Sequence, residues 1–141
     1  MFLPNPTRRA VLAAAWPALA ALADSELPPV RAITRAPGYH WFGYYDQLQF
    51  DPTGRYVLGM RADFEHRSPR PEDSIAIGMI DLHEHDRWIP LGGSRAWNWQ
   101  QGSMLQWIPG SRSEVVWNDR EGGRFVSRVM DVRTRRTRTL P

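Results

Sequence analysis

The feature that most constrains this 141-residue chain is an internal repeat of one β unit. The two copies occupy residues 48–91 and 105–140. Pro52 is matched by Pro109 57 positions later, whereas Asp81 is matched by Asp131 only 50 positions later. A longer stretch between Met60 and Ile75 of the first copy accounts for the difference. Because length changes confined to loops are expected between repeated units, we interpret the two segments as copies of one supersecondary unit.

Each copy contains four short runs rich in β-branched and aromatic residues. Turn signals such as Asp51-Pro52-Thr53-Gly54 and Glu121-Gly122-Gly123 separate the runs. Four-stranded units with a period of about 40–60 residues are typical of propeller blades. The sequence therefore predicts an all-β fold of about two blades of four antiparallel strands, which form an incomplete ring. The expected blades are 47–92 and 93–141, after a lead-in segment at 24–46.

An incomplete ring has consequences for partners. A closed propeller contains about four to eight blades, so two blades leave one sheet face uncovered on each side. We therefore expect either the N-terminal part of a longer protein or a truncated gene product. Uncovered sheet faces and edges also predict self-association.

Composition excludes several kinds of chemistry. The chain has no cysteine, which excludes disulfides, thiolate zinc sites and cysteine nucleophiles. All 18 basic residues are arginine, so neither a phosphate-loop lysine nor Schiff-base chemistry is available.

The first 23 residues are typical of an export signal. Arg8 and Arg9 precede an uncharged Ala/Leu-rich run over 10–23, and Ala21-Leu22-Ala23 supplies a small-x-small cleavage site. The order around the arginine pair resembles the twin-arginine export motif. The run is shorter than the about 20 apolar residues that span a membrane. We expect a signal helix that is removed, an exported periplasmic or extracellular bacterial protein, and no stable membrane span.

The net charge of +3 and the isoelectric point near 9.9 at first suggest a nucleic-acid partner. Without residues 1–23, however, 16 arginines face 15 acidic residues. The remaining arginine cluster, 133–138, falls at the turn between the third and fourth runs of the second copy and has no aromatic residues interleaved for base stacking. We therefore expect a solvated hairpin and no nucleic-acid binding.

Two resemblances to known families follow from these motifs. The pattern Phe50-Asp51-Pro52-Thr53-Gly54-Arg55, followed by Ile80-Asp81-Leu82, resembles the blade signature (PD40 type) of TolB-like propellers over residues 47–141. The segment His40-Trp41-Phe42-Gly43-Tyr44-Tyr45-Asp46 is similar to secreted bacterial proteins related to oligogalacturonate lyases. The second resemblance implies a polysaccharide lyase that acts by β-elimination with a divalent cation. In that family the metal-binding histidines and the catalytic base belong to later blades, so no catalytic residue is assigned here.

Strand alternation predicts where a site lies. In an antiparallel unit, the hairpin between the second and third strands emerges at the same end as the link into the next unit. Four groups with polar and aromatic side chains, at 40–46, 63–66, 97–101 and 118–120, therefore share one end. The candidate ligand-binding residues are His40, Tyr44, Tyr45, Asp46, His66, Trp97, Trp99, Gln100, Gln101, Asn118, Asp119 and Arg120.

This combination of side chains suits a saccharide. Aromatic rings cover pyranose faces, amides and carboxylates bind hydroxyls, and arginine pairs with carboxylates. The sequence predicts an exported module that binds a saccharide or a protein partner, with the lyase as the alternative. Equally, the group at 97–101 could pack between the two units. Replacing Tyr45 or Trp99 with alanine is expected to weaken saccharide binding if these residues form the site.

Two histidine-containing segments carry side chains that can bind a metal ion. His66 lies beside Asp63 and Glu65, in an exposed loop where solvation competes with metal binding. His83-Glu84-His85-Asp86 has ligand-like spacing, but it falls in the turn between the third and fourth runs, at the opposite end from the other groups. We interpret it as a polar turn and assign no metal ligand.

Overall fold

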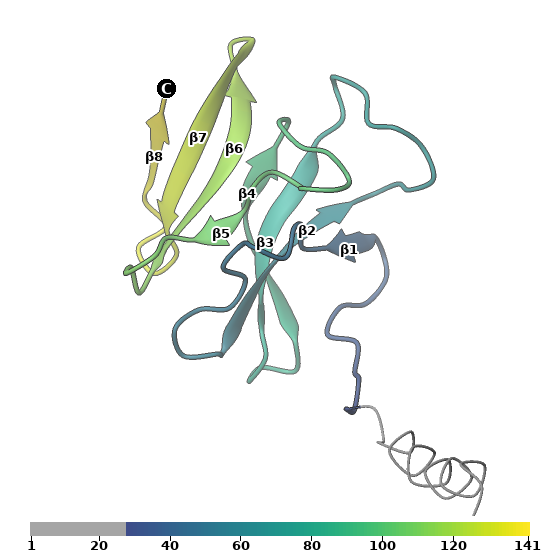
Figure 1. Cartoon of the computed structure of the whole chain (residues 1–141), viewed down its shortest axis with the longest axis vertical. Helices are drawn as coiled ribbons and strands as arrows, with labels where there is room; N and C mark the ends of the chain where they lie inside the picture. Colours follow the sequence, from purple (N-terminus) through teal and green to yellow (C-terminus); the bar gives the residue numbers. More distant parts are fainter. Residues whose placement is uncertain (1–27) are drawn as a thin grey trace, which may run out of the picture. The chain divides into compact units, whose positions relative to one another are not determined.

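The computed structural model describes residues 28–141, and residues 32–141 of these form one compact unit (Figure 1). The export signal predicted for 1–23, with Arg8 and Arg9, lies outside the described residues. None of the described residues forms a helix with the length and apolar character needed to cross a membrane.

The unit is all-β, as the sequence predicts, and contains two open four-stranded antiparallel sheets. Sheet 1 consists of β1 (Tyr39–Trp41), β2 (Tyr56–Ala62), β3 (Ile75–Asp81) and β4 (Arg87–Ser94). Sheet 2 consists of β5 (Gln106–Trp107), β6 (Glu114–Glu121), β7 (Arg124–Asp131) and β8 (Thr137–Leu140). In each sheet the strands lie in chain order, so each copy of the repeat folds as a meander of local hairpins (Figure 1).

The first strand of sheet 1 differs from the sequence expectation. The repeat places it near Phe50, but β1 lies nine residues earlier and pairs with the far half of β2, with Trp41 opposite Met60. Phe50 forms only an isolated bridge to Val57, at the near half of β2. The edge position beside β2 is therefore filled by two short segments, with residues 42–48 between them. Part of the expected lead-in, including His40, belongs to the sheet itself.

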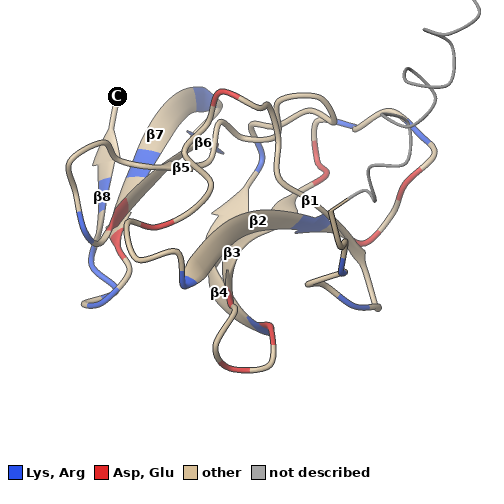
Figure 2. Ribbon diagram, turned by 60° about the horizontal axis from the view of Figure 1, so that its bottom comes forward, with Lys and Arg blue, Asp and Glu red and all other residues tan. Residues whose placement is uncertain are grey.

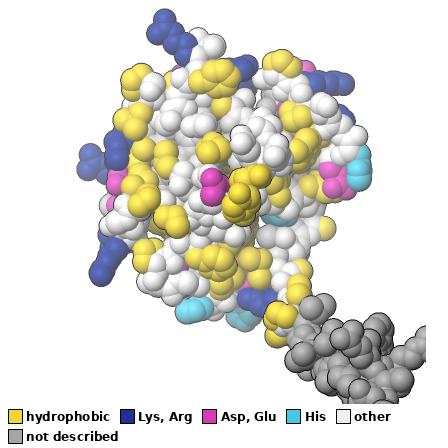
Figure 3. Space-filling view, in the orientation of Figure 1, with side chains coloured by type: hydrophobic (Ala, Val, Ile, Leu, Met, Phe, Trp, Pro, Cys, Tyr) yellow, Lys and Arg dark blue, Asp and Glu magenta, His cyan; other side chains and the backbone are white. Residues whose placement is uncertain are grey.

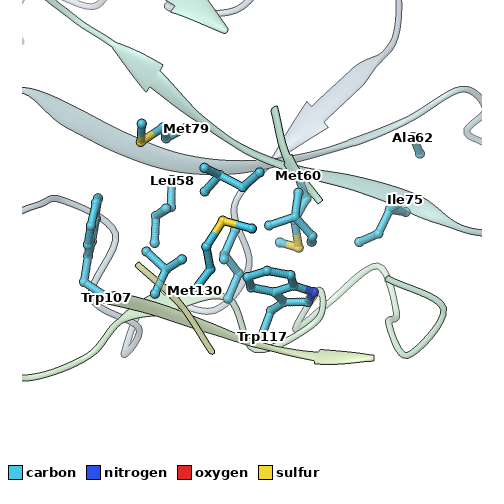
Figure 4. Packing of buried hydrophobic residues seen from close by; sticks show 12 residues of the cluster. Leu58, Met60, Ala62, Ile75, Met79, Trp107, Trp117 and Met130 are labelled. Carbon is cyan, nitrogen blue, oxygen red and sulfur yellow. The ribbon is translucent and has the colours of Figure 1, made fainter. Parts of the chain in front are cut away.

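The two sheets pack face to face through the alternate residues that each strand turns inward. Sheet 1 contributes side chains from β2, β3 and β4, and sheet 2 contributes side chains from β5, β6 and β7 (Figure 4). The labelled residues of this core are Leu58, Met60, Ala62, Ile75, Met79, Trp107, Trp117 and Met130. Two indole N–H groups cross between the sheets: Trp117 donates to the carbonyl of Gly93 (3.0 Å) and Trp107 to that of Gln49 (3.1 Å).

The matching aspartates of the repeat hold matching turns. Asp81 accepts hydrogen bonds from the Arg55 guanidinium (2.9 and 2.7 Å) at the end of β3. Asp131, at the end of β7, accepts from the backbone N–H of Thr134 (2.9 Å) and from the Ser113 hydroxyl (2.7 Å). These bonds, with the N–H of Thr134 first, lower the pKa of Asp131 to about 2. Each carboxylate thus ties the turn between the third and fourth strands of its sheet to the segment that precedes the second strand of that sheet.

The arginine cluster at 133–138 forms the turn from β7 to β8 and the start of β8. Arg138 pairs with Glu114, and Arg135 donates to the carbonyl of Pro90 (2.6 Å). Acidic positions lie near the arginine positions along the ribbon of this region (Figure 2). Much of the local positive charge is therefore balanced or bonded within the chain.

Candidate functional site

Four aromatic side chains from three of the predicted groups meet at one end of the sheets. Trp41 comes from β1, Phe64 from the long loop between β2 and β3, and Trp97 and Trp99 from the link between the sheets. Their ring centroids lie 5.0 Å apart for Trp97–Trp99, 5.1 Å for Trp41–Trp99 and 5.6 Å for Phe64–Trp99. We call these four residues the aromatic cluster.

The aromatic cluster anchors the long loop at 63–74. The indole N–H of Trp97 donates to the carbonyl of Asp73 (3.1 Å), and that of Trp99 donates to the carbonyl of Arg67 (2.8 Å). The Arg67 guanidinium lies 3.5 Å from the centroid of the Phe64 ring and pairs with both carboxylate oxygens of Asp73 (2.6 and 2.9 Å). The two tryptophans therefore have a packing role, and only their ring faces are available to a ligand.

The Arg67–Asp73 pair makes loop docking sensitive to acid. The Arg67 guanidinium, followed by the backbone N–H of Arg70, lowers the pKa of Asp73 to about 2. A lowered carboxylate pKa stabilises the folded state above the unfolded pKa near 4, and this contribution is lost as the pH falls toward 2. We expect indole fluorescence of the wild type to report a docked loop from pH 7 to about 4 and undocking as the pH falls further. In Asp73→Asn this acid transition should disappear, and an unchanged transition would contradict the assignment.

The first cleft, with a volume of about 400 Å³, borders this cluster. It is lined by Tyr39, His40, Trp41, Glu65, His66, Arg67 and Trp99. The indole nitrogen of Trp41 is buried and has no hydrogen-bond acceptor among residues 28–141. A buried donor without an acceptor costs about 1–3 kcal/mol, and a ligand oxygen within reach would recover that cost.

The two histidines of the cleft differ in environment. His40 packs edge-on against Trp88 (5.4 Å between centroids) and lies opposite Arg61 in the β1–β2 pair. Burial, followed by the nearby charge of Arg61, lowers the pKa of His40, so its imidazole is neutral at neutral pH. His66 is exposed, and its Nε2 lies 2.9 Å from a carboxylate oxygen of Glu65. The His40 imidazole therefore lies on the other side of the β1–β2 pair from Trp41, and the Glu65–His66 pair is the polar group that the cleft offers to hydroxyl groups.

A second groove, of about 470 Å³, lies on the other side of Trp97 along sheet 2. Gln101, Asn118 and Ser127 are its main polar lining residues, and Met104 and Phe125 are apolar ones. The Asn118 side-chain oxygen is already bonded to the Ser127 hydroxyl (3.3 Å). Its amides are partly used by the fold, so the groove is a weaker candidate site than the first cleft.

Several predicted residues form contacts within the fold or lie outside both the first cleft and the second groove. Asp119 accepts from the N–H of Arg95 (3.0 Å) and from Arg128 (3.1 Å); burial opposes ionisation, but these bonds outweigh it and lower the pKa of Asp119. Arg120 stacks on the Phe125 ring (4.8 Å). Six predicted residues line neither the first cleft nor the second groove: Tyr44, Tyr45, Asp46, Gln100, Asp119 and Arg120.

The structure adds cleft residues that the sequence reasoning did not select. Tyr39 and Trp41 belong to the three-residue β1, and Glu65 and Arg67 belong to the loop at 63–74. All four stand directly beside a selected histidine, Tyr39 and Trp41 beside His40 and Glu65 and Arg67 beside His66. No group of three or more His, Asp or Glu side chains within residues 28–141 is placed to hold a metal ion.

Comparison with known proteins finds no matching family, no matching curated protein and no matching solved structure.

Proposed function

We propose that this chain is an exported saccharide-binding module built from propeller-type blades, and that the saccharide binds in the first cleft. The observation that carries the proposal is the buried Trp41 N–H, which lacks an acceptor beside a cleft walled by Trp99 and Tyr39. A sugar hydroxyl would accept from this N–H while the apolar face of its ring packs on an aromatic side chain.

The rest of the cleft fits the same ligand class. Glu65 and His66 provide a polar rim, as expected where a ring's hydroxyls point outward. The docked loop at 63–74 forms one wall, held in place by Trp99 and by the Arg67–Asp73 pair.

The blade assignment and the location are part of this proposal. They are supported by the internal repeat, by the two four-stranded sheets in chain order, and by the signal-like sequence with Arg8 and Arg9. An exported module would meet saccharides in the periplasm or outside the cell. For the lyase alternative, the described residues supply no cluster that fits a divalent cation, so no specific observation favours it.

Two tyrosines offer a matched test of the cleft. Tyr39 is 42% exposed and lines the first cleft, whereas Tyr45 is 88% exposed and lies outside it. Tryptophan fluorescence of the wild type should titrate to saturation with at least one of three oligomer series: xylan, cellulose or galacturonan. We expect Tyr39→Ala to weaken that affinity about 3- to 10-fold and Tyr45→Ala to leave it unchanged.

Three results would argue against the proposal. The first is no saturable binding of any oligomer by the wild type, and the second is an equal loss of affinity in both tyrosine variants. The third is the formation of unsaturated products from galacturonan oligomers, which would establish the lyase alternative instead.

A further inference from the structure

Two adjoining cavities lie on the side of sheet 1 that faces away from sheet 2. The outer cavity has a volume of about 260 Å³ and the inner one of about 170 Å³. Five residues line both of them: Ile33, Thr34, His40, Ile80 and Trp88. Of these five, only His40 also borders the first cleft. We call the two cavities together the double cavity, which lies between the sheet and the chain that precedes β1.

A pair of glycines in the sheet leaves the space for the inner cavity. Gly59 of β2 and Gly78 of β3 stand opposite each other, so neither strand carries a side chain at this position. The Trp88 indole lies over Gly78, where a Cβ would overlap the ring. Gly59 borders the inner cavity, and it has no partner in β1 because β1 ends opposite Met60. The shortness of β1 therefore leaves an opening in the sheet edge beside Gly59.

The inner cavity has the size and the lining for a small apolar group. Most of its lining is apolar and includes Phe42, Val57 and Ile80. A cavity of about 150 Å³ lined by apolar side chains stays dry and can hold a benzene ring. The inner cavity is of this size, so it can take a single aromatic ring or a short branched aliphatic chain.

The outer cavity is the charged end of the double cavity. Arg35, Arg61 and His85 line it, with Asp86 as its acidic residue. Histidine and arginine side chains lie beside hydrophobic ones at the lower end of the molecule, where the turn from β3 to β4 lies (Figure 3). The Nε of Arg61 is buried and has no hydrogen-bond acceptor among the described residues. Burial, and then the charge of Arg61, lowers the pKa of His40, so the positive charge acts inside the double cavity.

We propose that the double cavity binds a small carboxylic acid with an apolar body. The carboxylate accepts hydrogen bonds from the Arg61 guanidinium in the outer cavity, and the apolar body fills the inner cavity beside Gly59. Arginine is suited to this task because its N–H groups match the two oxygens of a carboxylate.

The position of Arg61 supports this arrangement. Its guanidinium carbon lies 6.0 Å from the centroid of the Trp88 ring, and Trp88 lines both cavities. The aliphatic stem of Arg61 lies against Gly38, which leaves no room for a Cβ there. The site is independent of the proposed saccharide cleft, since the His40 and Arg61 side chains lie on the other side of the β1–β2 pair from Trp41.

The first test uses a probe that carries its own signal. In a titration of the full 141-residue chain, fluorine NMR of para-fluorobenzoate should show saturable binding with a dissociation constant on the order of 1 mM or lower. The uncharged para-fluorobenzyl alcohol should bind at least about 10-fold more weakly. No saturable binding of para-fluorobenzoate, or equal affinity for the alcohol, would overturn the proposal.

Two arginines locate the charged end of the site. Arg61→Met keeps an unbranched stem against Gly38 but removes the guanidinium, so we expect it to weaken para-fluorobenzoate binding at least about 10-fold. Arg112 is the matched control, because it is exposed and lies between β5 and β6 in the other sheet. Arg112→Met should leave the affinity unchanged. An equal effect of the two substitutions would show general charge attraction instead of a site at Arg61.

Two glycines locate the apolar end without changing any charge. A Cβ at Gly59 would lie 3.2 Å from the Ile80 side chain at the inner cavity, and one at Gly93 would lie 3.3 Å from the carbonyl of Ile75, away from both cavities. We expect Gly59→Ala to weaken para-fluorobenzoate binding about 3- to 10-fold and Gly93→Ala to leave it unchanged. Urea unfolding of both variants confirms that they fold. Full affinity in a folded Gly59→Ala variant would contradict binding of the ring in the inner cavity.

Discussion

Replacing Trp117 with alanine is expected to lower the free energy of unfolding by about 3–5 kcal/mol. Trp117 is 3% exposed and stands in the middle of the packing between the sheets. Its ring lies against Gly92, and its N–H donates to the carbonyl of Gly93, both on the edge strand β4. Truncation would leave a cavity and also an unbonded carbonyl. Urea unfolding followed by circular dichroism measures the loss.

Trp117→Phe is the matched control for this prediction. It keeps an aromatic ring in the core but removes the hydrogen bond to Gly93, so we expect a cost of about 1–2 kcal/mol. If Trp117→Ala cost less than about 1 kcal/mol, the two sheets would be stable without each other, and the packing described here would not be what holds the unit together.

The sheets could be predicted from sequence because their signals are local and repeated. Short runs rich in apolar residues over 56–62 and 75–81 define β2 and β3, and similar runs recur in the second copy. The match of Asp81 with Asp131 was also informative, since both carboxylates hold the same kind of turn. Because the same order of strands and turns must fit both copies, the repeat limits where the strands can lie more strictly than one segment alone does.

The first strand could not be placed in the same way. With three residues, β1 is too short to show a period, and its position depends on pairing with residues 60–62, about twenty positions later. Phe50 and its neighbours carry the blade-like signature, yet they provide only one bridge to β2. A non-local pairing of a short strand leaves no pattern in the sequence, which is why His40 was expected before the sheet rather than within it.

The site was predictable only at the level of which segments meet. Strand alternation correctly brought the segments around Trp41, Phe64 and Trp97 to one end. It could not distinguish a ligand contact from a packing contact, because the acceptors of the indole N–H groups are backbone carbonyls, at Asp73 and Arg67. Any residue supplies such a carbonyl, so the sequence holds no signal for it.

One glycine in the link between the sheets, Gly102, couples the position of a cleft residue to the packing of the core. Gly102 ends the turn that begins at Asn98 and carries Trp99, and its backbone N–H and C=O both bond to Asn98 (2.9 and 3.1 Å). Its φ is +61°, and a Cβ there would overlap the sulfur and methyl carbon of Met60. Met60 is 1% exposed and belongs to the core between the sheets. The position of Trp99 at the cleft thus depends on how the turn packs on β2.

Gly102→Ala is therefore expected to cost about 2–5 kcal/mol of unfolding free energy, from a left-handed backbone and from overpacking. Gly110 is the matched control, because its φ is +81° and a Cβ there meets no atom within 4 Å. Gly110→Ala should cost only about 1–2 kcal/mol, the backbone part alone. Urea unfolding of both variants isolates the contribution of the contact with Met60.

A double variant then tests whether that contact is the cause. In a Met60→Ala background, which lacks the overlapping atoms, Gly102→Ala should cost no more than Gly110→Ala, a non-additivity of about 1–3 kcal/mol. Gly102→Ala in the wild-type background should also weaken saccharide binding, since Trp99 would move with the turn. If Gly102→Ala cost as little as Gly110→Ala from the start, the turn would be free of the core. The geometry of the cleft would then have to be set by the loop at 63–74 alone.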